Sequence, residues 1–193
     1  MERLRWLAAV IFTAAAVFAG IFAYSTRGVR ADSGLDPERL QDQGAAPELT
    51  NNIWINSDKP LRLADLRGKV VLLDFWTFGC INCQHTLPYL KEAYAKYKGQ
   101  GVEFIGIHYP EFSYERDVNN VCDAVQREAI AFPVAIDNDG AAWNAYQMHA
   151  WPAFVIVDKF GRMRFRQIGE GRYDAISAAL DTLLAEPGPT AVF

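Results

Sequence analysis

Residues 69–90, KVVLLDFWTFGCINCQHTLPYL, decide the fold of this chain. The apolar and β-branched run from Val70 to Trp76 predicts a strand that is buried on both faces. A Thr-Phe-Gly break follows, and a helix is predicted to begin at two closely spaced cysteines, Cys80 and Cys83. The stretch therefore predicts a strand-to-helix junction that carries a C-x-x-C pair.

The position of the cysteine pair is typical of a redox switch. The unpaired amides and positive dipole end of a helix N-terminus stabilise a thiolate on Cys80, which is expected to be the more exposed sulfur. One helical turn also keeps the two sulfurs close enough to form and break a disulfide. C-x-x-C pairs also bind zinc, but a structural zinc site needs four ligands, and this sequence has no second pair and only three scattered histidines. An inert structural disulfide is the other alternative, and a redox dithiol is favoured.

Two acidic residues are candidates for the same site. Asp74 lies six residues before Cys80 on an otherwise apolar strand, so burial is expected to raise its pKa. A carboxyl group of that kind suits a general base that takes the proton from Cys83. The alternative is an aspartate at a solvated strand edge. Glu111, just past the next predicted strand, is a candidate second acid or an ordinary loop glutamate.

The pair Trp151-Pro152 marks a third candidate feature, because it stands directly before an apolar strand. A cis peptide bond there would leave a backbone edge free for a substrate chain, whereas composition alone favours an ordinary trans proline. Trp76 and Trp151 are expected to pack in the core and to wall the cleft. The third cysteine, Cys122, is expected to be a small buried hydrophobic residue rather than a resolving thiol.

The start of the chain predicts a membrane anchor. Residues 6–26 contain no charged side chain, and 21 residues of helix span roughly the hydrocarbon thickness of a bilayer. We expect a cytoplasmic N-terminus and an extracytoplasmic (periplasmic) domain on a single-pass cell-membrane protein, and cleavage of the segment as a signal peptide is the alternative. The expected division is an anchor at 1–30, a tether at 31–46, a folded domain at 47–186 and a tail at 187–193.

Composition limits the function classes. The chain has 193 residues, of which 51% are hydrophobic, which is enough for one ordinary core. Removing residues 1–30 takes four of the 19 basic and one of the 23 acidic residues, so the remainder carries 15 basic and 22 acidic side chains. A nucleic-acid partner is therefore not expected. Three cysteines are too few for a small domain held together by disulfides.

The rest of the chain alternates between strand and helix patterns. A short hairpin is predicted from residues 53–55 and 61–63, because an Asn-Ser-Asp-Lys turn lies between them. The predicted fold is α/β, with a central mixed sheet and helices on both faces. The other predicted elements are helices at 83–98, 114–130, 141–146 and 173–185, and strands at 102–108, 132–136, 154–157 and 163–168.

These features together resemble the thioredoxin superfamily. More narrowly, the chain is similar to the exported, membrane-tethered TlpA/ResA branch and to the thioredoxin-like domain of DipZ-type proteins. The blocks that carry the resemblance are FWTFGCINCQHTLPYL, HYPEF, DNDGAAW, AWPAF and GEGRYD, within residues 46–185. The resemblance implies a thioredoxin-like fold after the N-terminal transmembrane helix.

The resemblance also implies roles for individual residues. Cys80 would attack, Cys83 would resolve, Asp74 would be the buried acid, Pro152 the cis-proline and Glu111 the acid near the site. Two residues depart from the pattern. Gly79 stands where many relatives place Trp, and Trp151 is bulkier than its usual counterpart, so substrate specificity is not implied.

The function implied is an extracytoplasmic thiol-disulfide oxidoreductase that reduces disulfides of exported proteins and needs neither cofactor nor metal. Apocytochrome c is one candidate substrate, and a CcdA-type membrane thiol carrier is the expected electron donor. A peroxiredoxin-like peroxidase is one alternative; Thr77 fits its Pro-x-x-x-Thr-x-x-Cys motif, but Leu73 occupies the proline position. A Sco-like copper carrier is the other alternative, although the cysteines of such proteins are spaced by three residues rather than two.

Overall fold

The computed structural model describes residues 40–190 of the chain. The predicted anchor at residues 1–30 and most of the predicted tether lie outside the described residues. Within 40–190, no helix combines the length and the apolar character needed to cross a membrane.

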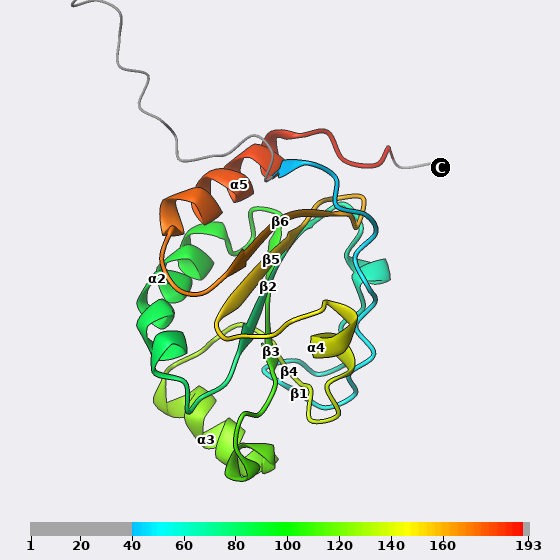
Figure 1. Ribbon diagram of the computed structural model, residues 1–193. Coiled ribbons are helices and arrows are strands. Elements are labelled where there is room, and N and C mark those ends of the chain that lie inside the picture. Colours follow the sequence, from blue (N-terminus) through cyan, green and yellow to red (C-terminus); the bar gives the residue numbers. More distant parts are fainter. Residues whose placement is uncertain (1–39, 191–193) are drawn as a thin grey trace, which may run out of the picture. The chain divides into compact units, whose positions relative to one another are not determined.

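A six-stranded mixed sheet forms the centre of the fold (Figure 1), as the sequence predicts. Its strand order is β1-β4-β3-β2-β5-β6, so the strand that leads to the cysteines lies inside the sheet with neighbours on both sides. The pairs β2-β3 and β3-β4 are parallel, and the pairs β1-β4, β2-β5 and β5-β6 are antiparallel. The strands are β1 (Trp54–Ile55), β2 (Val70–Trp76), β3 (Val102–His108), β4 (Val134–Ile136), β5 (Ala153–Val157) and β6 (Met163–Ile168).

Helices cover both faces of this sheet. Figure 1 shows α2 and α5 on one side and α4 on the other. The α-helices are α2 (Ile81–Tyr97), α3 (Val118–Arg127), α4 (Ala141–Ala145) and α5 (Tyr173–Ala185), and two 3₁₀-helices are η2 (Leu63–Leu66) and η3 (Ser113–Arg116).

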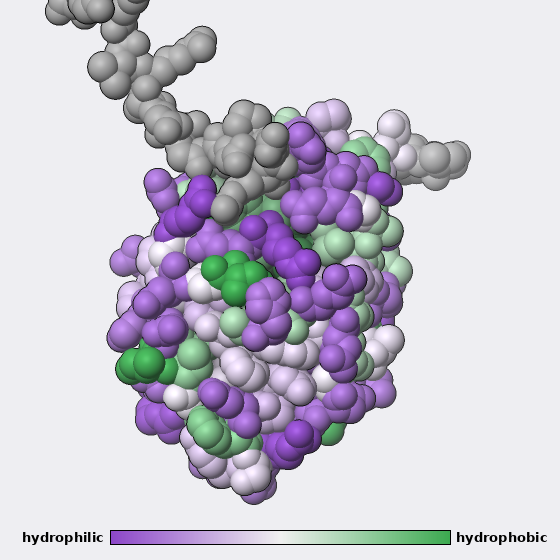
Figure 2. Space-filling model, viewed as in Figure 1, coloured by the Kyte–Doolittle hydropathy of each residue, from purple (hydrophilic) through white to green (hydrophobic). Residues whose placement is uncertain are grey.

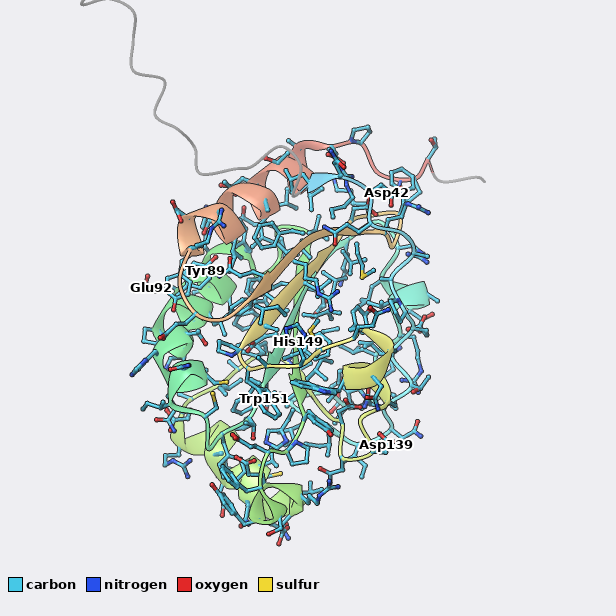
Figure 3. All side chains as sticks on the ribbon, in the orientation of Figure 1. Asp42, Tyr89, Glu92, Asp139, His149 and Trp151 are labelled. Carbon is cyan, nitrogen blue, oxygen red and sulfur yellow. The ribbon has the colours of Figure 1, made fainter. Side chains whose placement is uncertain are left out.

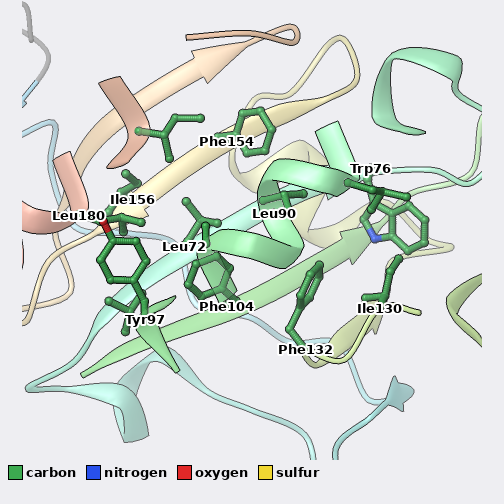
Figure 4. Close-up of a cluster of buried hydrophobic side chains, with 14 of the residues drawn as sticks. Leu72, Trp76, Leu90, Tyr97, Phe104, Ile130, Phe132, Phe154, Ile156 and Leu180 are labelled. Atoms are coloured by element: carbon green, nitrogen blue, oxygen red, sulfur yellow. The ribbon is translucent and has the colours of Figure 1, made fainter. Parts of the chain in front are cut away.

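Strand β2 is buried along its whole length because it supplies side chains to two cores. Val70, Leu72 and Trp76 point to the face covered by α2, α3 and α5, where they meet large side chains such as Phe104 and Leu180 (Figure 4). The alternate residues of β2 point to the opposite face and pack with α4 and η2. This double burial accounts for the nearly uninterrupted apolar run, and it makes the single charged residue of β2 conspicuous.

The predicted hairpin between residues 53–55 and 61–63 is wrong. Trp54 and Ile55 pair with Ala135 and Val134 of β4, and the second half of the predicted hairpin is not a strand. Instead Leu63 begins η2 and is buried on one face of the sheet. The edge of β4 offers β1 hydrogen-bond partners that are distant in sequence, and a local turn pattern does not reveal them.

The predicted helix at 114–130 is divided into η3 and α3. Asp117 separates them as the N-cap of α3, where its side chain accepts a hydrogen bond from the amide of Asn119 at 2.9 Å. A new helix therefore begins at Val118, and the preceding 3₁₀ turn has a direction of its own.

The folded part of the chain begins before residue 47. Gln43 donates its amide to Met163 O at 2.9 Å, and Met163 donates its own amide to Gly44 O at 2.9 Å. Ala45 forms an isolated bridge with Arg162. Residues 43–46, predicted as the end of the tether, therefore run along the outer edge of the sheet at the start of β6.

Candidate active site

The two cysteines lie at the start of α2, four residues beyond the end of β2. Cys80 is the N-cap of α2 with extended backbone (φ −81°, ψ 115°), and Cys83 lies in the first turn of the helix. Both are free thiols, and their side chains interact through a hydrogen bond. Cys80 is partly exposed and Cys83 is only 1% exposed. The predicted order of exposure is confirmed, so a disulfide arriving from solution meets Cys80 first.

Burial strongly raises the pKa of the Cys83 thiol. A hydrogen bond from the Thr77 backbone N–H acts in the opposite direction, while the Cys80 side chain and the charge of Asp74 raise the pKa further. Cys83 therefore stays protonated at neutral pH until a nearby group accepts its proton.

Asp74 lies under the cysteine pair, on the α2 face of the sheet. It shares that face of β2 with Leu72 and Trp76, and its neighbours on the adjoining strands are Gly106 and Phe154. The residue is 3% exposed, and within residues 40–190 its Oδ1 atom has no hydrogen-bond partner. Desolvation raises the pKa of Asp74 to about 8. The expected buried carboxyl group with a raised pKa is confirmed, and its charge acts on Cys83.

The acid that reaches the cysteine loop is Glu115 rather than Glu111. The side chain of Glu111 is exposed, and only its backbone amide meets the site. Glu115 is 0% exposed, and its Oε1 accepts a hydrogen bond from the amide of Gly79 at 2.8 Å. The sequence signal for Glu115 is its place as the third residue of η3, the position of the glutamate in a capping box. In the structure its Oε2 accepts a hydrogen bond from the amide of Phe112 at 2.8 Å, which is one half of that motif.

His108 is a second buried polar residue that the sequence did not single out. It ends β3, and its Nε2 lies 3.3 Å from Thr77 Oγ1, while the Phe78 ring stacks on the imidazole with centroids 5.6 Å apart. Burial lowers the pKa of His108 to about 4, although the charge of Glu115 acts in the opposite direction. The imidazole is therefore neutral at pH 7 and supports the Thr-Phe-Gly segment before Cys80.

The aromatic residues predicted to wall the cleft have different surroundings. Trp76 is 2% exposed and belongs to the core (Figure 4). Its indole lies close against Gly106. Trp151 is half-buried and packs against Tyr109 and Trp143, with ring centroids 5.9 and 4.6 Å away, on the segment between α4 and β5 (Figure 3). The Trp151-Pro152 peptide bond is cis, as the resemblance implied.

Exposed apolar side chains occur next to the cysteine loop. The face seen in Figure 2 is mostly polar with isolated apolar residues. Ile81, Phe112 and Tyr114 are each about half exposed, at 59%, 49% and 52%. The rings of Phe112 and Tyr114 stack with centroids 5.7 Å apart, and Tyr114 also contacts Phe78. These side chains present apolar surface to solvent beside the cysteine loop.

No group of three or more His, Cys, Asp or Glu side chains in the described part of the chain is arranged to hold a metal ion. The chemically distinctive groups near α2 are instead two thiols and two buried carboxyl groups. This set can exchange a disulfide and move the accompanying proton.

Comparison with known proteins agrees with this set of groups. The model of the AhpC/TSA family matches residues 43–166. Protein DipZ of Mycobacterium tuberculosis is 39% identical over 155 residues, which are 78% of this chain and 22% of DipZ. This chain therefore spans about a fifth of the length of that relative.

Two further comparisons cover most of the other protein. Thiol-disulfide oxidoreductase ResA of Bacillus cereus is 32% identical over 148 residues, or 77% of this chain and 82% of ResA. The crystal structure of a thioredoxin-like superfamily protein superposes with a TM-score of 0.70 at 30% identity, and covers 75% of this chain and 99% of the other. The thioredoxin-like fold implied by the sequence is confirmed.

Proposed function

This chain belongs to the AhpC/TSA family, and from that premise we propose that it is a thiol-disulfide oxidoreductase that reduces disulfides of exported proteins. The observation that carries the proposal is a free dithiol at the start of α2, with one sulfur accessible, the other buried and a carboxyl group of raised pKa on the sheet below.

The reaction begins with attack by the Cys80 thiolate on one sulfur of a substrate disulfide. A bond forms between Cys80 Sγ and that sulfur, and the other substrate sulfur leaves as a thiolate that takes up a proton from water. Cys83 Sγ then attacks Cys80 Sγ, which releases the second substrate thiolate. The substrate gains two electrons, and the enzyme is left with a Cys80–Cys83 disulfide.

Asp74 serves the second step as general base. The Cys83 thiol is buried and holds its proton, so the attack needs an acceptor for that proton inside the protein. A carboxyl group with a pKa near 8 changes protonation close to neutral pH, where a general base is most effective. Cys83 therefore transfers its proton to Asp74 as its sulfur bonds to Cys80.

We expect the substrate chain to lie over Ile81, Phe112 and Tyr114, whose exposed side chains supply apolar contacts next to the cysteine loop. An external dithiol must then reduce the Cys80–Cys83 disulfide, and a CcdA-type membrane thiol carrier suits this role. We place the domain outside the cytoplasm behind an N-terminal membrane anchor, with apocytochrome c among the candidate substrates.

The full chain, reduced and freed of excess reductant, tests this proposal when mixed with insulin as a substrate with accessible disulfides. Each molecule should reduce one substrate disulfide, Cys80→Ser should reduce none, and Cys122→Ser should match the wild type. A reduced wild-type chain that transfers no electrons to the disulfide would refute the proposal.

The direction of electron transfer is tested by equilibration with glutathione buffers. A reductase is expected to lie near the value for thioredoxin, about −270 mV. A potential above about −180 mV would assign the pair to disulfide formation or isomerisation instead.

A further inference from the structure

Glu115 is an ionisable residue that the reaction above does not use, although it is fully buried. Its Oε1 accepts the Gly79 amide at 2.8 Å, and its Oε2 accepts the amides of Glu111 at 2.6 Å and Phe112 at 2.8 Å. A carboxylate that accepts three backbone donors is held rigidly and carries its charge as an acceptor-only group. It therefore joins the loop before Cys80 to the loop after β3.

Gly79 is matched to this carboxylate. A Cβ atom at position 79 would lie 2.4 Å from Glu115 Oε1 and 2.8 Å from the Tyr114 hydroxyl, so any side chain would displace the acid. The backbone of Gly79 is not in the left-handed region, and contact rather than backbone freedom requires glycine here. This contact gives a physical reason for the glycine that departs from the tryptophan of many relatives.

We propose that Glu115 is a positioning residue for Cys80. Glu115 fixes the cysteine loop through the Gly79 amide and makes the Cys80–Cys83 dithiol a stronger reductant. The inference rests on the proposed thiol-disulfide exchange and concerns the same pair of sulfurs.

Two effects of the Glu115 carboxylate support this role. The carboxylate accepts the hydrogen bond of the Gly79 N–H, one residue before Cys80. The Gly79 N–H is therefore not available to stabilise a cysteine thiolate. The negative charge of the carboxylate also disfavours a thiolate nearby but leaves a neutral disulfide almost unaffected. Both effects destabilise the reduced pair relative to the oxidised pair, and a couple with a less stable reduced form is the stronger reductant.

The variant Glu115→Gln removes the charge of the side chain but should leave the fold intact. A glutamine keeps the shape of the side chain but has only one acceptor oxygen. It therefore cannot accept hydrogen bonds from the Gly79 amide and from the amides of Glu111 and Phe112 with separate oxygens. We expect the equilibrium constant with glutathione to move towards the reduced enzyme by about tenfold or more, which for a two-electron couple corresponds to about 30 mV. Glu92→Gln, the same chemical change on the exposed surface of α2, should leave the constant unchanged (Figure 3).

A second variant keeps the test valid if Glu115→Gln does not fold. Gly79→Ala retains the charge but pushes the carboxylate from its place, and should move the equilibrium constant in the same direction. If Glu115 acts through Gly79, the shift in the double variant should be clearly smaller than the sum of the two single shifts. Far-UV circular dichroism and thermal melting establish which variants fold.

An unchanged constant in folded Glu115→Gln, a shift towards the oxidised enzyme, or fully additive shifts would each overturn this role. The measurement needs only the Cys80–Cys83 couple, so it stands apart from the insulin test. A wild type that fails to reduce insulin refutes the proposed function, whereas an unshifted Glu115→Gln refutes the positioning role alone.

Discussion

Asp74→Asn should make the stability of the protein less dependent on pH. In the folded chain the pKa of Asp74 is about 8, against an ordinary value of 3.8, because the carboxyl group is desolvated. Between these two values the folded protein holds a proton that the unfolded chain has lost. Stability therefore falls as pH rises through this interval and stops falling above the folded pKa.

His108 has the opposite effect on stability over part of this pH range. Its pKa falls from 6.5 to about 4 on folding, so the unfolded chain binds the extra proton between these values, and stability rises with pH there. The two residues therefore oppose each other between pH 4 and 6.5. From pH 6.5 to 8 only the Asp74 effect remains of the two, and with about 1.4 kcal/mol for each pKa unit it amounts to roughly 1.5–2 kcal/mol.

Urea unfolding of the reduced full chain at pH 6.5, 7.25 and 8 measures this loss. The free energy of unfolding of the wild type should fall by roughly 1.5–2 kcal/mol over the series, and that of Asp74→Asn should stay nearly level. At pH 6.5 the variant should be less stable by about 1–3 kcal/mol, because the amide must place its polar atoms in a buried position where Asp74 Oδ1 already has no hydrogen-bond partner. Asp123→Asn, an exposed aspartate on α3, should keep the wild-type slope.

The same variant tests the proposed role in catalysis. Without a proton acceptor below Cys83, resolution should slow about 10²-fold or more near pH 7, so mixed disulfide accumulates. Equal slopes of stability against pH in wild type and Asp74→Asn would refute the raised pKa. An unchanged resolution rate from pH 6 to 8 would remove Asp74 from the mechanism.

Three further outcomes are expected. One equivalent of iodoacetamide should modify Cys80 in the reduced chain while Cys83, at 1% exposure, stays unmodified, and equal labelling of both by mass spectrometry would contradict the assigned order of attack. Leu90→Ala should cost about 2–5 kcal/mol in the free energy of unfolding, because Leu90 is fully buried in the α2 core, and a loss below 1 kcal/mol would contradict that packing. Gly106→Ala should cost about 1–3 kcal/mol by calorimetry, because its Cβ would lie 2.9 Å from Trp76 Nε1, and a neutral result would mean that the indole moves freely.

The elements predicted well from sequence are those whose pattern is imposed by burial on both faces of a strand, by alternation along a strand or by one buried face of a helix. Strands 70–76, 102–108 and 163–168 and the last helix, 173–185, have the predicted bounds. Local signals failed where the partner is distant along the chain. The β1 strand pairs with β4, about 80 residues later, while the turn signal beside it suggested a hairpin.

The residues of the candidate site also differ in whether local sequence was enough to predict them. Cys80, Cys83 and Asp74 were accessible to sequence reasoning because they belong to one strand and the helix that follows it. Glu115 was not, because its burial depends on how η3 folds the loop after β3 back to Gly79. The sequence suggested Glu111, the first acid after the strand, and the structure places that side chain in solvent.

Under the proposed function, the edges of the sheet affect how this protein meets extended polypeptides. An open strand edge can pair with an extended polypeptide, and the proposed reductase would meet such polypeptides as substrates. Here β1 is only two residues long, and the start of β6 is covered by residues 43–46. Arg164 adds a charged side chain on β6 that donates to Leu40 O at 2.7 Å. Backbone pairing with other chains is thereby discouraged at both borders of the sheet. Under the proposed function, a substrate would instead meet the surface around Cys80.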